Sequence, residues 1–134
     1  MSAQGSVLPA PWRAELGRLA RFCVVGASNT LITLGSYALL LLAGCPAEAA
    51  SAVAFALGAL NGYHWNARWT FAVRGALWRY VGVQGLGAGL SAAGVAAARG
   101  QGVARLTAEV VILPAVTLIT YCLSRRFVFS APAA

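Results

Sequence analysis

Long uncharged stretches make up most of the chain, and short segments rich in arginine separate them. Uncharged runs occupy residues 22–47, 49–67 and 80–98, and a fourth apolar stretch follows over 106–124. A run of about 20 apolar residues lets a helix cross a bilayer, and a helix satisfies its own backbone hydrogen bonds in lipid. The pattern predicts an all-α integral membrane protein. Its four transmembrane helices are expected over 23–43, 49–66, 80–98 and 106–124.

The arginines are distributed unevenly around these helices and indicate how the chain is oriented. Two of the ten, Arg99 and Arg105, lie between the third and fourth helices, and the other eight lie at the opposite ends. Because basic residues are enriched on the cytoplasmic side, both termini are expected in the cytoplasm. The predicted organisation is a cytoplasmic tail over 1–20, a membrane domain over 21–130 and a second cytoplasmic tail over 131–134.

The amino-acid composition excludes several classes of protein function. Hydrophobic residues make up 60% of the chain and charged residues 10%, against about 45–50% and about 25% in soluble domains. A soluble enzyme is excluded, and four helices leave no room for a catalytic domain. The net charge of +7 comes from arginines beside apolar runs, which is the membrane pattern rather than a nucleic-acid-binding face. We expect no enzymatic activity, no cofactor and no metal site.

Two parts of the sequence recur with one spacing. Arg21-Phe22 corresponds to Arg79-Tyr80, and segment 66–71 corresponds to segment 124–129, both at an offset of 58 residues (79 − 21 and 129 − 71). The chain is interpreted as two copies of one helical hairpin in the same orientation, so the axis relating them lies along the membrane normal. Small residues spaced four apart predict close helix packing, within one monomer or in a homo-oligomer. They are Ala54, Gly58 and Gly62 on the second helix, and Gly85, Gly89, Ala93 and Ala97 on the third.

Polar side chains inside the predicted helices are candidates for a binding path. Asn29 and Thr33 share one face of the first helix, Asn61 and Asn66 lie near the cytoplasmic end of the second, and Gln84 lies in the third. Amides are costly in lipid and should face other helices or a wet crevice. Packing between helices and a polar path for a headgroup both remain open. The fourth helix carries a comparable row of hydroxyls, Thr117, Thr120 and Ser124.

Arginine and aromatic residues gather where the second and fourth helices end on the cytoplasmic side. Arg68 and Trp69 follow the second helix, and Arg125 and Arg126 follow the fourth. One interpretation is anchoring by snorkelling arginines and interfacial rings. The other is a site for an anionic lipid headgroup, because the guanidinium fork suits phosphate.

Two further features have structural explanations. Glu109 follows Arg105 by four residues, and we expect an ion pair between them, with a titrating carboxylate as the alternative. The segment ending at Cys45 is similar to a lipoprotein processing box. The apolar run before it exceeds the roughly 7–15 residues of a cleavable signal, so the chain is expected to stay uncleaved.

Three motifs together resemble the GtrA-like membrane proteins. Segment 21–30 is similar to the opening of that family, segment 66–71 to its signature after the second helix, and segment 124–129 to an echo of that signature. The sequence departs from the family pattern at Ala67, where arginine is usual, and at Ser124 and Phe127, where asparagine and tryptophan are usual. The resemblance implies four helices in the bacterial cytoplasmic membrane and a role in cell-surface polysaccharide synthesis.

This resemblance implies that the chain moves a polyprenyl-phosphate-linked sugar across the membrane. The alternative is a non-transporting anchor or scaffold for a polyprenyl-phosphate glycosyltransferase. A small multidrug-type exporter is disfavoured, because no acidic residue lies in the middle of a predicted helix. The residues expected to hold the phosphate are Arg68, Arg125, Arg126 and Trp69. Those expected to line the path of the sugar are Asn29, Thr33, Asn61, Asn66 and Gln84.

Overall fold

The computed structural model describes residues 9–130, apart from the side chains of residues 47–48, 105–106 and 109. Within this range all regular secondary structure is helical, and α2 and α4 each continue into one π-helical turn. The elements are α1 (Ala10–Leu42), α2 (Ala47–Trp65), η1 (Asn66–Thr70), α3 (Leu77–Gly100), α4 (Arg105–Leu123) and η2 (Ser124–Val128). The tail segments 1–8 and 131–134 and the expected pair of Arg105 with Glu109 lie outside the described part.

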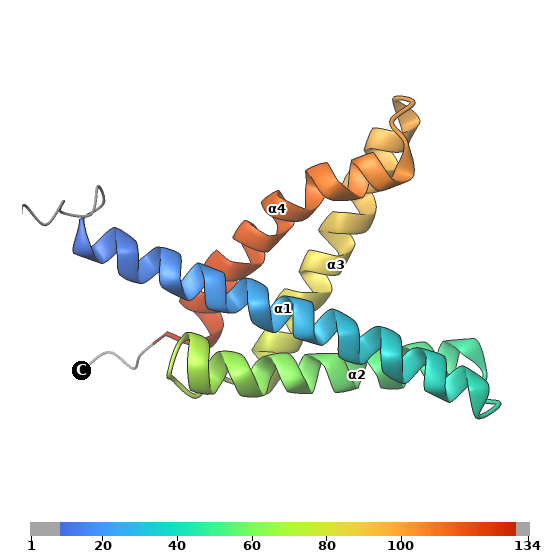
Figure 1. Ribbon diagram of the computed structural model, residues 1–134, viewed down its shortest axis with the longest axis horizontal. Helices are drawn as coiled ribbons and strands as arrows, with labels where there is room; N and C mark the ends of the chain where they lie inside the picture. The colour runs from blue at the N-terminus through green and yellow to red at the C-terminus, as the bar shows by residue number, and fades with distance from the viewer. Residues whose placement is uncertain (1–8, 131–134) are drawn as a thin grey trace, which may run out of the picture.

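The four α-helices form two antiparallel hairpins. Helix α1 packs along α2, and α3 packs along α4. The hairpins meet at the end where η1 and η2 lie and diverge from there, so their tips are far apart (Figure 1). This shared end holds most of the contacts between elements distant in sequence, and it therefore positions the candidate sites described below.

The two hairpin tips have the same backbone turn. At the first tip Gly44 has a φ of 85°, and at the second Gly102 has a φ of 84°. The N–H of Gly44 donates to the carbonyl of Leu41, and the N–H of Cys45 donates to that of Leu40. This is the Schellman pattern, in which a glycine at positive φ ends a helix and satisfies its last carbonyls. The bonds at Gly102 repeat it 58 residues later.

The outer surface is apolar in a way that requires a lipid environment. Leu31, Leu39 and Val111 are 73%, 68% and 67% exposed, although large aliphatic side chains are normally buried in soluble proteins. Among the described residues, three helical stretches are long and apolar enough to cross a membrane. They are Ala10–Leu42, Leu77–Gly100 and Val110–Val128. The chain is thus an all-helical, multi-pass membrane protein.

The helices extend beyond the predicted spans. Helix α1 has 33 residues and begins at Ala10, inside the segment expected to be a tail, with Pro11 in its first turn. Proline is tolerated there because the first N–H groups of a helix have no intrahelical partner. The predicted ends of the second and fourth spans, Asn66 and Ser124, are the residues at which the helix widens into η1 and η2.

Six aromatic rings join the hairpins at their shared end, and we call this group the aromatic joint. Phe71 stacks on Phe129 with ring centroids 4.9 Å apart. Around this pair the contacts recur in both halves: Phe71 stacks on Tyr121 at 5.7 Å, and Phe129 stacks on Tyr63 at 6.0 Å. Each tyrosine thus packs on a ring from the other hairpin. The members of the joint are Phe22, Tyr63, Phe71, Tyr80, Tyr121 and Phe129.

The small-residue stripe on α2 packs against α1, and at Gly62 also against Tyr80 of α3. A Cβ added at Gly58 would lie 2.2 Å from Oγ1 of Thr33, so this glycine lets α1 approach closely. The stripe predicted on α3 behaves differently, because the Cα positions of Gly85 and Gly89 face open space. Helix α3 approaches α4 through Gly87 and Gly94 instead.

Candidate functional site

A polar cavity of about 560 Å³ lies between the two hairpins, close to their shared end. All four α-helices and η1 contribute to its lining, with apolar walls from residues such as Phe22, Phe55 and Val116. Its polar lining residues are Asn29 and Thr30 from α1, Asn66 from η1, Tyr80, Gln84 and Ser91 from α3, and Thr117 and Thr120 from α4. None of the described lining residues carries a charge at neutral pH, so the cavity offers hydrogen bonds and no ionic partner.

Asn66, which lines this cavity, has a buried side-chain oxygen without a hydrogen-bond donor among the described residues. Its side chain is 1% exposed, and its Nδ2 donates to the hydroxyl of Tyr80 at 3.2 Å. Its Oδ1 has no hydrogen-bond partner in the described part of the chain. A buried amide oxygen without a donor costs about 1–3 kcal/mol, so a ligand or water that donates to it would be favoured.

Glycine at position 62 brings polar groups from three helices together beside the cavity. A Cβ added there would lie 2.2 Å from both Nδ2 of Asn29 and the hydroxyl oxygen of Tyr80. Asn29 is also bound across the hairpin, because Nδ2 of Asn61 donates to its Oδ1 at 2.9 Å and to Oγ of Ser28 at 2.8 Å. The amide of Asn61 thus positions Asn29, whose side chain lines the cavity.

The structure brings three of the five predicted path residues into one cavity. Asn29, Asn66 and Gln84 line it, whereas Thr33 packs against Gly58 and Asn61 holds the α1–α2 hairpin together. Tyr80 and Ser91 also line the cavity and are not among the predicted path residues. Their spacing could have identified them, because residues 80, 84, 87 and 91 share one face of a helix.

The predicted headgroup residues each have a different partner in the structure. Arg68 lies beside His64, with Nη1 and Nε2 3.5 Å apart. The ring of Trp69 lies under the guanidinium of Arg21, 5.8 Å from the ring centroid. Arg126 covers the ring of Phe127 at 5.9 Å. These residues therefore form an arginine–aromatic rim spread over η1 and η2.

Two other arginines hold the π-helical turns in place. Nη1 of Arg21 donates to the carbonyl of Trp69 at 3.3 Å, and Nη1 of Arg79 donates to the carbonyl of Phe127 at 3.4 Å. The two bonds are related by the 58-residue offset. Each ties the first helix of a hairpin to one carbonyl at the end of that hairpin, where a helix lacks intrahelical donors.

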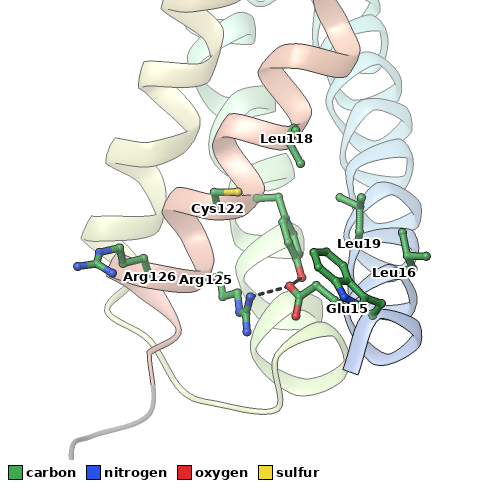
Figure 2. A pocket seen from close by; sticks show the side chains of 9 residues that line it. Glu15, Leu16, Leu19, Leu118, Cys122, Arg125 and Arg126 are labelled. Atoms are coloured by element: carbon green, nitrogen blue, oxygen red, sulfur yellow. Dashed lines mark hydrogen bonds and ion pairs between the residues drawn. The ribbon is translucent and has the colours of Figure 1, made fainter. Parts of the chain in front are cut away.

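A second cavity, of about 600 Å³, lies between the N-terminal part of α1 and the C-terminal part of α4, and we call it the α1–α4 groove. Figure 2 shows Leu16 and Leu19 on one side, Leu118 and Cys122 on the other, and Arg125 directed at Glu15. Arg126 extends away from Glu15 in this view. The groove therefore combines an aliphatic wall with a charged end.

Glu15 is the centre of that charged end. Its Oε1 accepts hydrogen bonds from Nη1 of Arg125 at 2.8 Å and from the hydroxyl of Tyr121. Its Oε2 accepts from Nη1 of Arg18 at 3.2 Å. One carboxylate thus faces two guanidinium groups, and the cluster keeps a net positive charge. Arg125 was predicted from the sequence to bind phosphate, and here it binds an internal carboxylate.

Comparison with known proteins places this arrangement in a family. The chain is 37% identical over 62 residues to the uncharacterized membrane protein YngA of Bacillus subtilis, which covers 46% of this chain and 42% of that protein. It is 38% identical over 60 residues to the dolichol-phosphate mannosyltransferase of Pyrococcus furiosus, covering 45% of this chain and 17% of that protein. The matches thus span less than half the length of either relative. The profile of the GtrA/DPMS transmembrane domain matches residues 21–129, and the chain belongs to this family.

Proposed function

We propose that this protein binds a polyprenyl-phosphate-linked sugar and moves it across the membrane in which it is embedded. Membership of the GtrA/DPMS transmembrane domain family supports a role connected with such lipids. The observation that carries the proposal is the uncharged polar cavity between the hairpins, which is lined by amide and hydroxyl side chains from α1, η1, α3 and α4. An apolar bundle gains nothing in stability from such a cavity, whereas a sugar rich in hydroxyls matches its amides and hydroxyls.

The proposal includes an arrangement in the membrane. All four α-helices would cross it, with α2 as the partner of α1, and both termini would lie in the cytoplasm with the arginine–aromatic rim. The eight arginines gathered at this end support the orientation. The contacts that recur at 58 residues support two copies of one hairpin, related by a pseudo-twofold axis along the membrane normal.

In this arrangement the two ends of the ligand have separate partners. When the ligand is loaded, its anionic phosphate would lie at the cytoplasmic rim, where Arg68, Arg125 and Arg126 supply guanidinium groups at headgroup depth. Its neutral sugar would enter the cavity beside Asn66 and Gln84. A volume of about 560 Å³ is within the range of about 300–1,000 Å³ of small-molecule sites. The chain itself would bind and release the sugar without changing a covalent bond.

A leaflet-resolved assay tests the proposal. The purified chain is reconstituted in vesicles with a short-chain polyprenyl-phosphate hexose, and membrane-impermeant periodate reports the fraction of sugar in the outer leaflet. Gln84→Leu and Thr117→Val each remove one hydrogen-bonding group from the lining of the cavity. We expect each to slow transfer roughly fivefold, as for the loss of about 1 kcal/mol.

Matched substitutions outside the cavity control for the change in polarity. Gln101→Leu lies at the end of α3, and Thr107→Val lies in the first turn of α4, and both side chains are exposed. Both variants should transfer sugar at the rate of the unsubstituted chain. Equal rates for Gln84→Leu and Gln101→Leu would contradict the role of the cavity, and absence of transfer by the unsubstituted chain would contradict the function.

A membrane scaffold for a glycosyltransferase is the second candidate function. One observation favours it: a relative named as a dolichol-phosphate mannosyltransferase matches this chain over only 17% of its own length, so in that protein the matching segment is joined to a much larger remainder. Under this function a glycosyltransferase would co-purify with the chain from membranes, and the purified chain alone would move no sugar.

A further inference from the structure

The α1–α4 groove contains an anion-binding arrangement that an acidic residue of the chain itself occupies. The three donors on Glu15 come from two helices: Arg18 from α1, and Tyr121 and Arg125 from the end of α4 and the start of η2. Tyr121 is 4% exposed and is held in place by the aromatic joint. Phenol and guanidinium donors that converge in this way are suited to the oxygens of a carboxylate or a phosphate.

The charge of this arrangement exceeds that of its occupant. One carboxylate faces the guanidinium groups of Arg18 and Arg125, at 3.2 and 2.8 Å, and leaves one positive charge uncompensated. The side chain of Glu15 is 26% exposed and that of Arg125 is 51% exposed. An ion pair this accessible is worth at most about 1 kcal/mol, so a competing anion can displace it.

The apolar part of the groove indicates what kind of anion would fit. Trp12, Leu16 and Leu19 lie on one face of α1, and Leu118 and Cys122 face them from α4. Trp12 and Leu16 remain 64% and 49% exposed. A free inorganic anion would leave this wall uncovered. An amphiphile with a phosphate beside an aliphatic chain would cover the wall and place its phosphate at Arg125.

We propose that the α1–α4 groove binds the phosphate and adjoining isoprenoid units of a polyprenyl-phosphate lipid, and that Glu15 holds the phosphate position until the lipid displaces it. The lipid identity rests on the proposed function, whereas the site itself rests on these contacts. Most of one wall, from Trp12 to Leu19, precedes the segment that the family profile matches, 21–129. In this proposal Glu15 is a counter-ion for Arg125 that the phosphate of the lipid displaces.

Equilibrium binding of farnesyl phosphate to the full chain in phosphatidylcholine nanodiscs tests this proposal. Glu15→Gln removes the competing charge and keeps the shape of the side chain, and we expect roughly fivefold tighter binding. Arg125→Gln removes a donor to the phosphate, and we expect binding to weaken by a similar factor. Arg74→Gln, an exposed arginine near the same end of the bundle that does not line the groove, should bind as the unsubstituted chain does.

A second pair of variants tests the apolar wall without changing a charge. Leu16→Ser lies in the groove, and Leu31→Ser, at a 73% exposed position on the same helix, lies outside it. Leu16→Ser should weaken binding of farnesyl phosphate and Leu31→Ser should leave it unchanged. Both positions are exposed, so folding is expected to survive, and circular dichroism checks that it does.

Three ligands serve as comparisons, and each gives a clear outcome. Farnesol, inorganic phosphate and phosphatidylglycerol should each bind more weakly than farnesyl phosphate. Equal binding of any one of them would overturn the proposal, as would Glu15→Gln with unchanged or weaker binding of farnesyl phosphate. The vesicle transfer assay separates the groove site from the proposed function. If farnesyl phosphate binds as expected and no sugar is transferred, the groove site holds and the proposed function fails. If sugar is transferred and farnesyl phosphate does not bind as expected, the proposed function holds and the groove site fails.

Discussion

Phe71 and Phe129 stack on each other at the end where the two hairpins meet, with ring centroids 4.9 Å apart and ring planes 12° apart. They occupy equivalent positions in the two hairpins, 58 residues apart in sequence. Each lies one residue after a π-helical turn, and its N–H donates across that turn, to the carbonyl of Asn66 or of Ser124. The π-helical turns η1 and η2 therefore position the two rings where the hairpins meet.

This relationship makes Phe129 a residue on which stability depends. Its side chain is 3% exposed, whereas the nearby Phe127 is 52% exposed. Phe129→Ala should lower the free energy of unfolding by about 3–5 kcal/mol, because it leaves a cavity inside the aromatic joint. Phe127→Ala is the matched control and should change it far less. Thermal unfolding in detergent provides the measurement, and equal losses for the two variants would contradict the assignment.

Gly62 is predicted to tolerate no side chain. An added Cβ would lie 2.2 Å from Asn29 and Tyr80, so Gly62→Ala should destabilise the protein by about 1–3 kcal/mol through overpacking. Gly85→Ala is the control, because nothing lies within 4 Å of its added Cβ. Alanine favours a helix over glycine by about 1 kcal/mol, so this variant should unfold at a higher temperature.

Ser124 should be dispensable for stability although it is fully buried. Its Oγ has no hydrogen-bond partner in the described part of the chain, and an unpaired buried hydroxyl is a cost of about 1–3 kcal/mol. Ser124→Ala should therefore leave the melting temperature unchanged or raise it. A clear fall in the melting temperature would mean that the hydroxyl makes a hydrogen bond to a group outside the described residues, such as a buried water.

Arg21 and Arg79 should contribute equally, because they make the same bond in the two hairpins. Each donates to a carbonyl of the adjacent π-helical turn, at 3.3 and 3.4 Å. Replacing either arginine by glutamine should lower the free energy of unfolding by less than about 1 kcal/mol, since both side chains are exposed. Thermal unfolding of the two variants should give similar shifts. A large effect from one alone would show that the two turns are held differently.

Much of the fold could be read from the sequence. Charge-free runs predicted the helices, whereas the two copies of one hairpin inferred from the offset of Arg21 and Arg79 stay a prediction. The length and polarity of a segment depend only on its own residues, so they can be predicted from the sequence without knowing the fold. The extension of α1 to Ala10 was missed because Arg13, Glu15 and Arg18 interrupt the apolar run, although they lie on a helix that emerges from the bundle.

The candidate sites were harder to predict because they depend on which faces meet. Asn61 and Asn29 have the same side chain and bond to each other across the hairpin, yet only Asn29 lines the cavity. Arg125 has a carboxylate partner 110 residues away in sequence, and no local pattern encodes that distance. Only the packing of α1 against the end of α4 decides it.

The exchange of rings between the hairpins has a consequence for the ancestry of such chains. Tyr63 reaches the second hairpin and Tyr121 reaches the first, so the interface between them is isologous, of the kind that a symmetric dimer uses. A gene encoding one hairpin already specifies both complementary surfaces. Fusion of two such genes would join the two hairpins of a homodimer into one chain while keeping the contacts between them.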